Sequence, residues 1–137
     1  MRWDPVAKIE GKPLCSVLAE RDNQGAMQDK VQCNRTVSFS SRARLTPSAS
    51  RRERSSVFPR GGNQMTLHIV GGLGLGGCDA YPDVFDAFAG FADDAKVDNG
   101  WLKRPDRPGI GFEAQSELYA LMRQLARFIS KKGLTPT

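Results

Sequence analysis

The chain has 137 residues, of which 39% are hydrophobic, so it can form one domain with a modest core. It contains no run of about 18 apolar residues, which excludes a membrane-spanning helix. The first five residues lack the apolar stretch of a secretory signal peptide, so we expect a cytoplasmic protein. The formal net charge is +5, and its distribution along the chain is uneven.

The positive charge lies in residues 32–60, which contain seven arginines, no lysine and one glutamate. This segment carries +6, so the remainder of the chain carries −1. Serine and arginine dominate residues 32–56, and such a composition cannot bury enough apolar surface to offset the entropy of ordering the chain. We therefore expect residues 32–56 to be disordered.

Two short helices are predicted in residues 3–21. Asp4 can cap the first helix, and Gly11 interrupts the helical pattern. Pro13 suits the start of a second helix that runs through Glu20.

Residues 64–75 fit either a strand or a helix. The β-branched residues between Met65 and Val70 favour a strand, but several apolar residues also fit a helical face. Gly71 and Gly72 would cost a helix about 2 kcal/mol relative to alanine. We favour a short, weak helix only because the family resemblance described below implies one.

The dipeptide Asn99-Gly100 predicts a hairpin, because both residues suit the positive φ angles of a tight turn. The flanking strands are expected at Ala95–Val97 and Trp101–Lys103. Residues 110–113 are expected to be extended.

A C-terminal helix is the clearest predicted element. Ser116 is a suitable N-cap, and Lys131 suits the negative end of the helix dipole. The spacing of the apolar residues predicts a face turned toward the core, or a partner-binding face if the chain lacks the rest of its core. These residues are Leu118, Leu121, Met122, Leu125, Phe128 and Ile129.

The three cysteines are odd in number and form no C-x-x-C pair, so we expect free thiols. His68 has no second histidine or cysteine near it in sequence, which argues against a metal role.

Residues 72–77 match G-x-G-x-x-G, but Pro82 would interrupt the helix that must follow, so we expect no dinucleotide. The aspartates between Asp83 and Asp94 do not have the spacing of a calcium loop.

Several segments resemble one enzyme family. The motif Phe58-Pro59-Arg60-Gly61-Gly62 and the glycine-rich stretch 71–82 resemble the end of the barrel in sugar-acid dehydratases of the mandelate racemase subgroup of the enolase superfamily. Residues 3–21 resemble the helical segment that joins the family's capping domain to its barrel. Within the superfamily the likeness is closest to D-tartrate dehydratase and related enzymes. Further matching segments are Gly90–Asp94, Asp98–Gly100 and Pro108–Glu113.

The resemblance implies an α/β fold, an incomplete fragment of a (β/α)8 enolase-type barrel, which typically needs about 250 residues. The expected elements are two short N-terminal helices, a disordered middle, a short β-hairpin and one long C-terminal helix. We expect residues 1–31 to correspond to the junction of capping domain and barrel. Residues 32–56 would form a linker, and residues 57–137 the C-terminal barrel remnant and its tail.

The resemblance also implies a chemistry. In this family a bound Mg²⁺ stabilises the enediolate that forms when a base removes the proton beside the substrate carboxylate. Three acidic residues on successive strands hold the ion, which prefers hard oxygen ligands, and a lysine base lies on an earlier strand. Those strands belong between the matching segments, where Glu53 is the sole acid after Asp29. We therefore expect no metal and no cofactor for this chain.

Two positions correspond to the family's active site. Arg60 occupies the position of the family's histidine base, and arginine stays protonated near neutral pH. Asp79 occupies the position of the family's glutamate and can still hydrogen-bond a substrate, although we expect a solvated loop residue there. Lys8 and Lys12 can face a substrate in the intact family fold, but we expect ordinary surface lysines.

These observations predict a truncated relative of a Mg²⁺-dependent sugar-acid dehydratase, a carbon–oxygen lyase, that is inactive alone. One alternative is a segment of an active dehydratase that another chain completes, with a sugar acid as substrate. An alternative of another class is an arginine-rich protein that binds nucleic acid or an acidic surface. Poor aromatic interleaving argues against nucleic acid. Uncovered strand edges and helix faces would favour a homo-oligomer or a complementing chain as partner.

Overall fold

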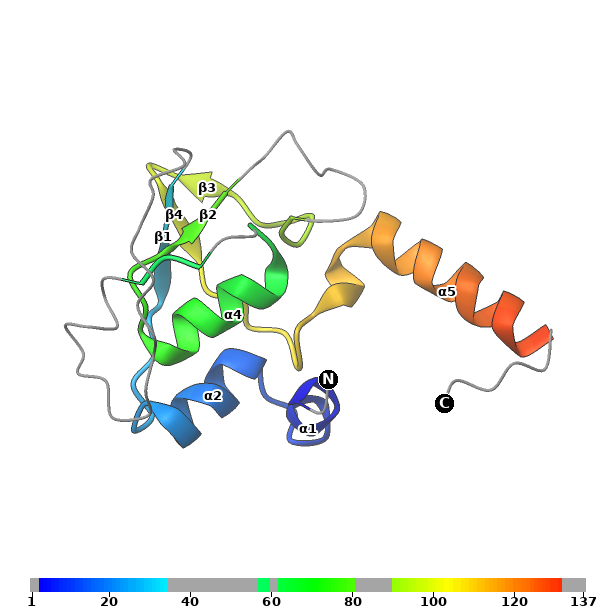
Figure 1. Ribbon diagram of the computed structural model, residues 1–137, viewed down its shortest axis with the longest axis horizontal. Helices are drawn as coiled ribbons and strands as arrows, with labels where there is room; N and C mark the ends of the chain where they lie inside the picture. Colours follow the sequence, from blue (N-terminus) through cyan, green and yellow to red (C-terminus); the bar gives the residue numbers. More distant parts are fainter. Residues whose placement is uncertain (1–2, 35–56, 60–61, 81–89, 132–137) are drawn as a thin grey trace.

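The computed structural model of the protein describes residues 3–34, 57–59, 62–80 and 90–131. The protein contains both helices and strands, and Figure 1 colours them by their order in the chain. The helices are α1 (Trp3–Ile9), α2 (Leu14–Asp22), α4 (Gln64–Leu73), the 3-10 helix η1 (Phe112–Ala114) and α5 (Ser116–Lys131). The strands are β1 (Lys30–Asn34), β2 (Cys78–Asp79), β3 (Val97–Asp98) and β4 (Trp101–Lys103). The expected pair of N-terminal helices, hairpin and C-terminal helix are all present.

The four strands form one mixed sheet in the order β2-β1-β4-β3. β1 is parallel to β2 and antiparallel to β4. The predicted hairpin is confirmed, because β3 and β4 pair across a turn in which Asn99 and Gly100 have φ angles of 48° and 79°. Its first strand is Val97–Asp98, however, and not Ala95–Val97 as expected. The sheet is therefore parallel only on the β2 side of β1.

Strand β1 corrects one expectation about the basic segment. Residues 32–34 were expected to be disordered, but they form the end of β1. Val31 and Cys33 alternate with outward-facing residues and are both buried, so the strand contributes one face to the core. Pairing with strands distant in sequence stabilises a segment whose composition alone predicts disorder. The rest of that prediction, for residues 35–56, lies outside the described residues.

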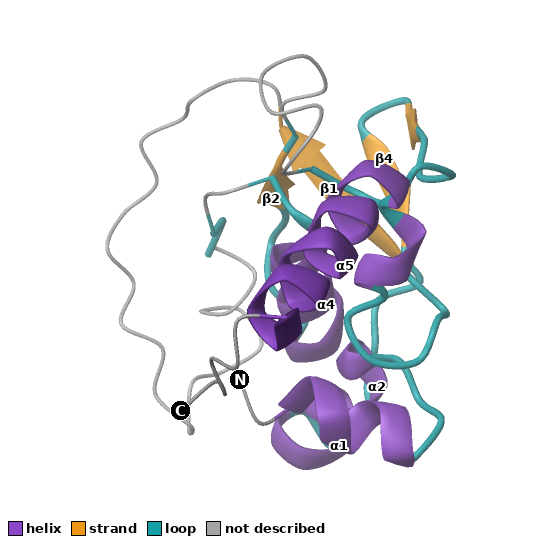
Figure 2. Ribbon diagram, turned by 90° about the vertical axis from the view of Figure 1, so that its right-hand side faces the viewer, coloured by secondary structure: helices purple, strands orange, loops and turns teal. Residues whose placement is uncertain are grey.

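Helix α4 lies between the sheet and α2, as Figures 1 and 2 show. Its first turn is capped by Asn63, whose side chain accepts a hydrogen bond from the Thr66 N–H. Gly74 ends the helix in the left-handed conformation, with φ of 67°. The main apolar cluster lies between α4 and the sheet and consists of Val31, Cys33, Leu67, Val70, Leu75, Cys78, Ala80 and Leu102.

One of the two glycines of α4, Gly72, has a packing role that helps to explain why a helix forms here. A Cβ at Gly72 would lie 2.6 Å from the Cys15 carbonyl oxygen and 3.0 Å from the Leu18 Cβ, both on α2. The absence of a side chain therefore allows α2 and α4 to approach closely. The predicted short helix is confirmed, and close helix–helix packing offsets the low helix propensity of glycine.

The N-terminal helices pack around the loop that precedes η1. Leu14 and Val17 of α2 form a second apolar cluster with Ala7 and Ile110. Asp4 does not cap α1 as predicted, because the helix already begins at Trp3. Its Oδ1 accepts a hydrogen bond of 2.6 Å from the Ile110 N–H and so joins α1 to this loop.

The C-terminal segment differs from the prediction in two ways. Residues 112–114 form the 3-10 helix η1, although residues 110–113 were expected to be extended. Gly111 causes the difference, because it adopts a left-handed conformation with φ of 73° and ends the extended path. Helix α5 forms as predicted, although Ser116 is its first residue and not its N-cap. None of its residues is buried, so the expectation of a core-facing helix is wrong. In Figure 1, α5 extends away from the sheet and the other helices. No helix in the described ranges is both long and apolar enough to cross a membrane.

Candidate functional site

Two parallel strands end side by side, at the edge of the sheet where the sequence predicts a functional residue. β1 and β2 are neighbours, with Cys33 beside Cys78 and Asn34 beside Asp79. The chain passes between the two strands through α4, which packs against both. In sheets built this way, functional side chains gather at the carboxyl ends of the strands. Asp79 is the last residue of β2 and therefore lies at this edge.

Asp79 is more enclosed than the sequence suggested. It lies in a strand and is 8% exposed, so the expectation of a solvated loop residue is wrong. The pairing of β2 with β1 causes this burial, and no local sequence pattern indicated it. Arg60, the other predicted site residue, lies outside the described residues.

The sequence missed a pair of thiols next to Asp79. The Cys33 and Cys78 sulfur atoms lie 3.9 Å apart on the facing strands, and both side chains are buried. The hydrogen bond between the two thiols lowers the pKa of Cys33, whereas the same bond and burial raise the pKa of Cys78. All three cysteines are free thiols, as predicted. Strand pairing brings residues 33 and 78 together, and a search for closely spaced cysteines cannot detect such a pair.

His68 is fully buried and links three parts of the structure. Its Nδ1 accepts a hydrogen bond of 3.1 Å from the Cys15 N–H, and its Nε2 lies 2.9 Å from the Ile110 carbonyl oxygen. This carbonyl can only accept, so Nε2 carries the proton and the ring is neutral. Burial lowers the pKa of His68 to about 4. Both ring nitrogens are used in joining α2, α4 and the Ile110 loop, so the ring has no nitrogen left for a metal.

The described residues do not fit the Mg²⁺ site that the family resemblance implies. Within residues 3–34, 57–59, 62–80 and 90–131, no group of three or more His, Cys, Asp or Glu residues could hold a metal ion. Asp79 has the right donor chemistry, but an ion of this kind needs several hard oxygen ligands in near-octahedral geometry. The described residues therefore support no metal-dependent step.

The two N-terminal lysines form ion pairs. The Lys8 Nζ lies 2.6 Å from Glu113 and 3.1 Å from Asp4, and the hydrogen bond to Glu113 is the main cause that raises the pKa of Lys8. The Lys12 Nζ lies 2.8 Å from Glu20. Both lysines therefore fit the expectation of surface residues.

A pocket of about 230 Å³ lies between the start of α4 and the segment that follows β4. It begins beside Lys103 of β4, which pairs with Lys30 at the start of β1. Arg107, on its rim, lies 3.0 Å from Asp94, so these two charges compensate each other. Asp79 is not one of the described residues that line this pocket. Its lining residues are Gln64, Leu67, Ala92, Asp94, Ala95, Lys103, Arg104, Pro105, Asp106 and Arg107.

Comparison of the chain with models of known protein families finds no match.

Proposed function

We propose that this chain is a truncated relative of a Mg²⁺-dependent sugar-acid dehydratase and does not catalyse dehydration alone. The observation that carries the proposal is the arrangement of β1, α4 and β2. Two parallel neighbouring strands with a packed helix between them form a βαβ unit, the repeating unit of a (β/α)8 barrel. The motifs that resemble the dehydratases lie in the second half of this unit.

The position of Asp79 supports the same proposal. The residue that matches the family's glutamate lies at the carboxyl end of a parallel strand, where barrel enzymes place their active-site groups. A carboxylate there can accept a hydrogen bond from a hydroxyl group of a sugar acid. The side chain is one methylene shorter than glutamate, so its carboxylate would reach less far beyond the strand.

The proposed inactivity follows from the chemistry of the reaction. Removal of the proton beside a carboxylate leaves two negative charges on one enediolate, which needs a metal ion or equivalent cations for stabilisation. The described residues provide no set of hard ligands for such an ion. A base is needed as well, and an arginine at position 60 stays protonated near neutral pH.

An assay of the purified chain tests this proposal. The chain is incubated with Mg²⁺ and a panel of aldonic and aldaric acids, and formation of the keto acid is followed. An intact sugar-acid dehydratase serves as the positive control. We expect no turnover above the buffer rate. Turnover that requires Mg²⁺ and is abolished by Asp79→Asn would contradict the proposal and show that the lone chain builds a complete site.

A further inference from the structure

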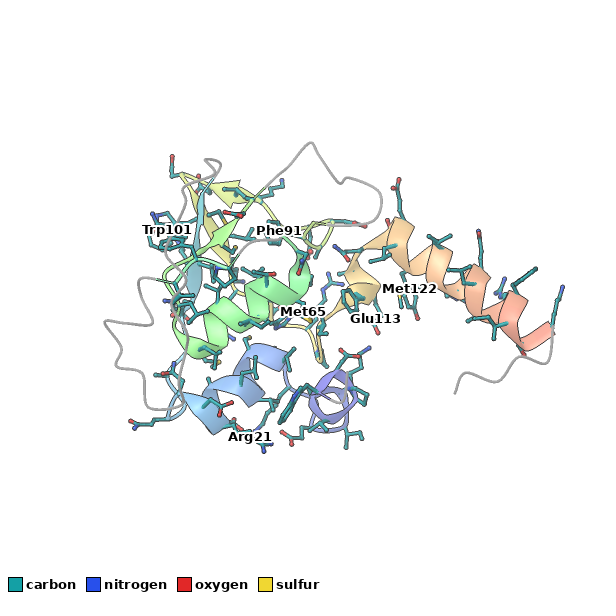
Figure 3. The ribbon with its side chains drawn as sticks, viewed as in Figure 1. Arg21, Met65, Phe91, Trp101, Glu113 and Met122 are labelled. Carbon is teal, nitrogen blue, oxygen red and sulfur yellow. The ribbon has the colours of Figure 1, made fainter. Side chains whose placement is uncertain are left out.

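Helix α5 presents an apolar face that the described part of the protein does not bury. None of its 16 residues is buried, and the exposed fractions of Met122, Leu125 and Phe128 are 46%, 52% and 56%. In Figure 3, Met122 lies on α5, outside the body that contains Met65 and Phe91. A continuous apolar face of this kind usually marks a binding surface. A helix of this length is also marginal in water without tertiary packing, so a partner would stabilise it.

The spacing of the apolar residues indicates what kind of partner fits. They recur at alternating intervals of three and four residues, the pattern by which two helices pair as a coiled coil. Leu118 and Leu125 occupy heptad position a, and Leu121 and Phe128 occupy position d. Met122 and Ile129 occupy position e and make the apolar face wider. The g positions, which border this face on its other side, are Glu117, Gln124 and Lys131.

The order of these residues is complementary to itself when two copies run antiparallel. Leu121 of one copy then faces Leu125 of the other, and Leu118 faces Phe128. The four apolar layers are symmetric about position 123. Because a two-fold interface places the same surface on both copies, this symmetry is what a homodimer requires.

The charges also favour the antiparallel orientation. Glu117 and Lys131 lie on the same edge of the apolar face, at opposite ends of α5. In an antiparallel pair, Glu117 of each copy comes beside Lys131 of the other, which forms two ion pairs. In a parallel pair the g positions face position e, where Met122 and Ile129 offer no charge. The two helix dipoles also point in opposite directions in the antiparallel pair, which is favourable for neighbouring helices.

A lipid surface fits the face less well. Arg123 and Arg127 lie on the side of α5 opposite the apolar face, as their heptad positions f and c require. Cations can reach lipid headgroups more easily from the borders of the apolar face than from the opposite side of the helix. Lys131 is the only cation at the three g positions, and Glu117 at another g position would be repelled by an anionic membrane.

We propose that the protein forms a homodimer in which the α5 helices of two copies pair antiparallel through this face. The paired helices span about 24 Å, the length of 16 helical residues. The contact is small, so the dimer should be reversible and depend on concentration. The proposal does not depend on the chain's relation to dehydratases.

Sedimentation velocity of the full chain under reducing conditions tests the proposal between about 1 µM and about 1 mM. We expect a monomer–dimer equilibrium within this range. Leu125→Glu places a charge in a central layer and should weaken dimerisation at least about 30-fold, the effect of burying one unpaired charge. Ala120→Glu introduces the same charge on the opposite side of α5 and should leave the dimer unchanged. A monomer throughout the range, or equal behaviour of the two variants, overturns the proposal.

Charge reversals test the orientation independently of the apolar layers. Glu117→Lys and Lys131→Glu should each weaken the dimer about tenfold, because two exposed pairs change per dimer. The double variant should recover most of the loss, with helicity followed by circular dichroism as the control. No effect of either single reversal overturns the antiparallel register. A monomer that binds phosphatidylserine vesicles but never dimerises assigns the face to lipid and also overturns the proposal.

Discussion

The two adjacent glycines of α4 allow a test of how closely this helix packs on α2. Gly71 and Gly72 are both buried and helical, so alanine at either position gains about 1 kcal/mol of helix propensity. If propensity alone decided the outcome, both Gly71→Ala and Gly72→Ala would stabilise the protein equally. The structure predicts opposite signs instead.

The surroundings of the two added methyl groups differ. At Gly71 the nearest atom would be the Val31 Cγ2 at 3.7 Å, which is an ordinary contact. Gly71→Ala should therefore stabilise the protein by about 1 kcal/mol. At Gly72 the methyl would lie 2.6 Å from the Cys15 carbonyl oxygen, part of a helix backbone that cannot move aside cheaply. Overpacking against a helix backbone lies at the upper end of the usual cost of about 1–3 kcal/mol, so after the propensity gain of about 1 kcal/mol Gly72→Ala should be destabilising by about 2 kcal/mol net.

Urea unfolding followed by far-ultraviolet circular dichroism measures both effects under the same conditions. We expect the two variants to differ by about 3 kcal/mol in the free energy of unfolding, with unchanged m values. Stabilisation by both substitutions would refute the close approach of α2 and α4. Equal destabilisation by both would show that the two sites do not differ in space as described.

Three further predictions follow from the core and the turn. His68 has a folded-state pKa of about 4, below the unfolded value of 6.5, so its contribution to stability is complete above pH 6.5 and declines as the pH falls toward 4. Lowering the pH from 7.5 to 5 should therefore reduce the free energy of unfolding by about 2 kcal/mol through the protonation of this histidine. A His68→Gln variant provides the comparison, because it lacks this part of the pH dependence. Gly100→Ala should destabilise the protein by about 1 kcal/mol in thermal unfolding, because φ is 79° and the nearest contact, the Cys33 carbonyl oxygen at 3.8 Å, adds no clash. The three buried cysteines should react with a thiol reagent at the rate of unfolding, and immediate reaction of the native protein would argue against this core.

Local signals in the sequence predicted the elements whose formation depends on nearby residues. Asn99-Gly100 specified the hairpin turn through its φ preferences, and the 3-4 spacing specified α5. The identity of α4 could not be derived from its own residues, because the packing of α2 at Gly72 decides it. The end of β1 was missed for the same reason, since the strands that stabilise it lie more than 40 residues away in the chain.

The candidate site was only partly predictable. Asp79 was found by its position in a family motif, but its burial depends on the pairing of β2 with β1. The Cys33–Cys78 pair has no local signature, because parallel strands bring together residues that are separated by a crossover. The role of α5 was also misjudged, because an apolar stripe indicates a buried face without indicating which molecule buries it.

The most direct test of the proposed function is the Mg²⁺-dependent dehydratase activity of Arg60→His, measured beside the unchanged chain. This substitution supplies the histidine that the proposed relatives have at the corresponding position, but it provides none of the carboxylate ligands that a Mg²⁺ ion needs. We predict no turnover of any aldonic or aldaric acid by either protein. Turnover by Arg60→His that EDTA abolishes would show that the chain assembles a working metal site, and it would contradict the proposal that this chain is an incomplete relative.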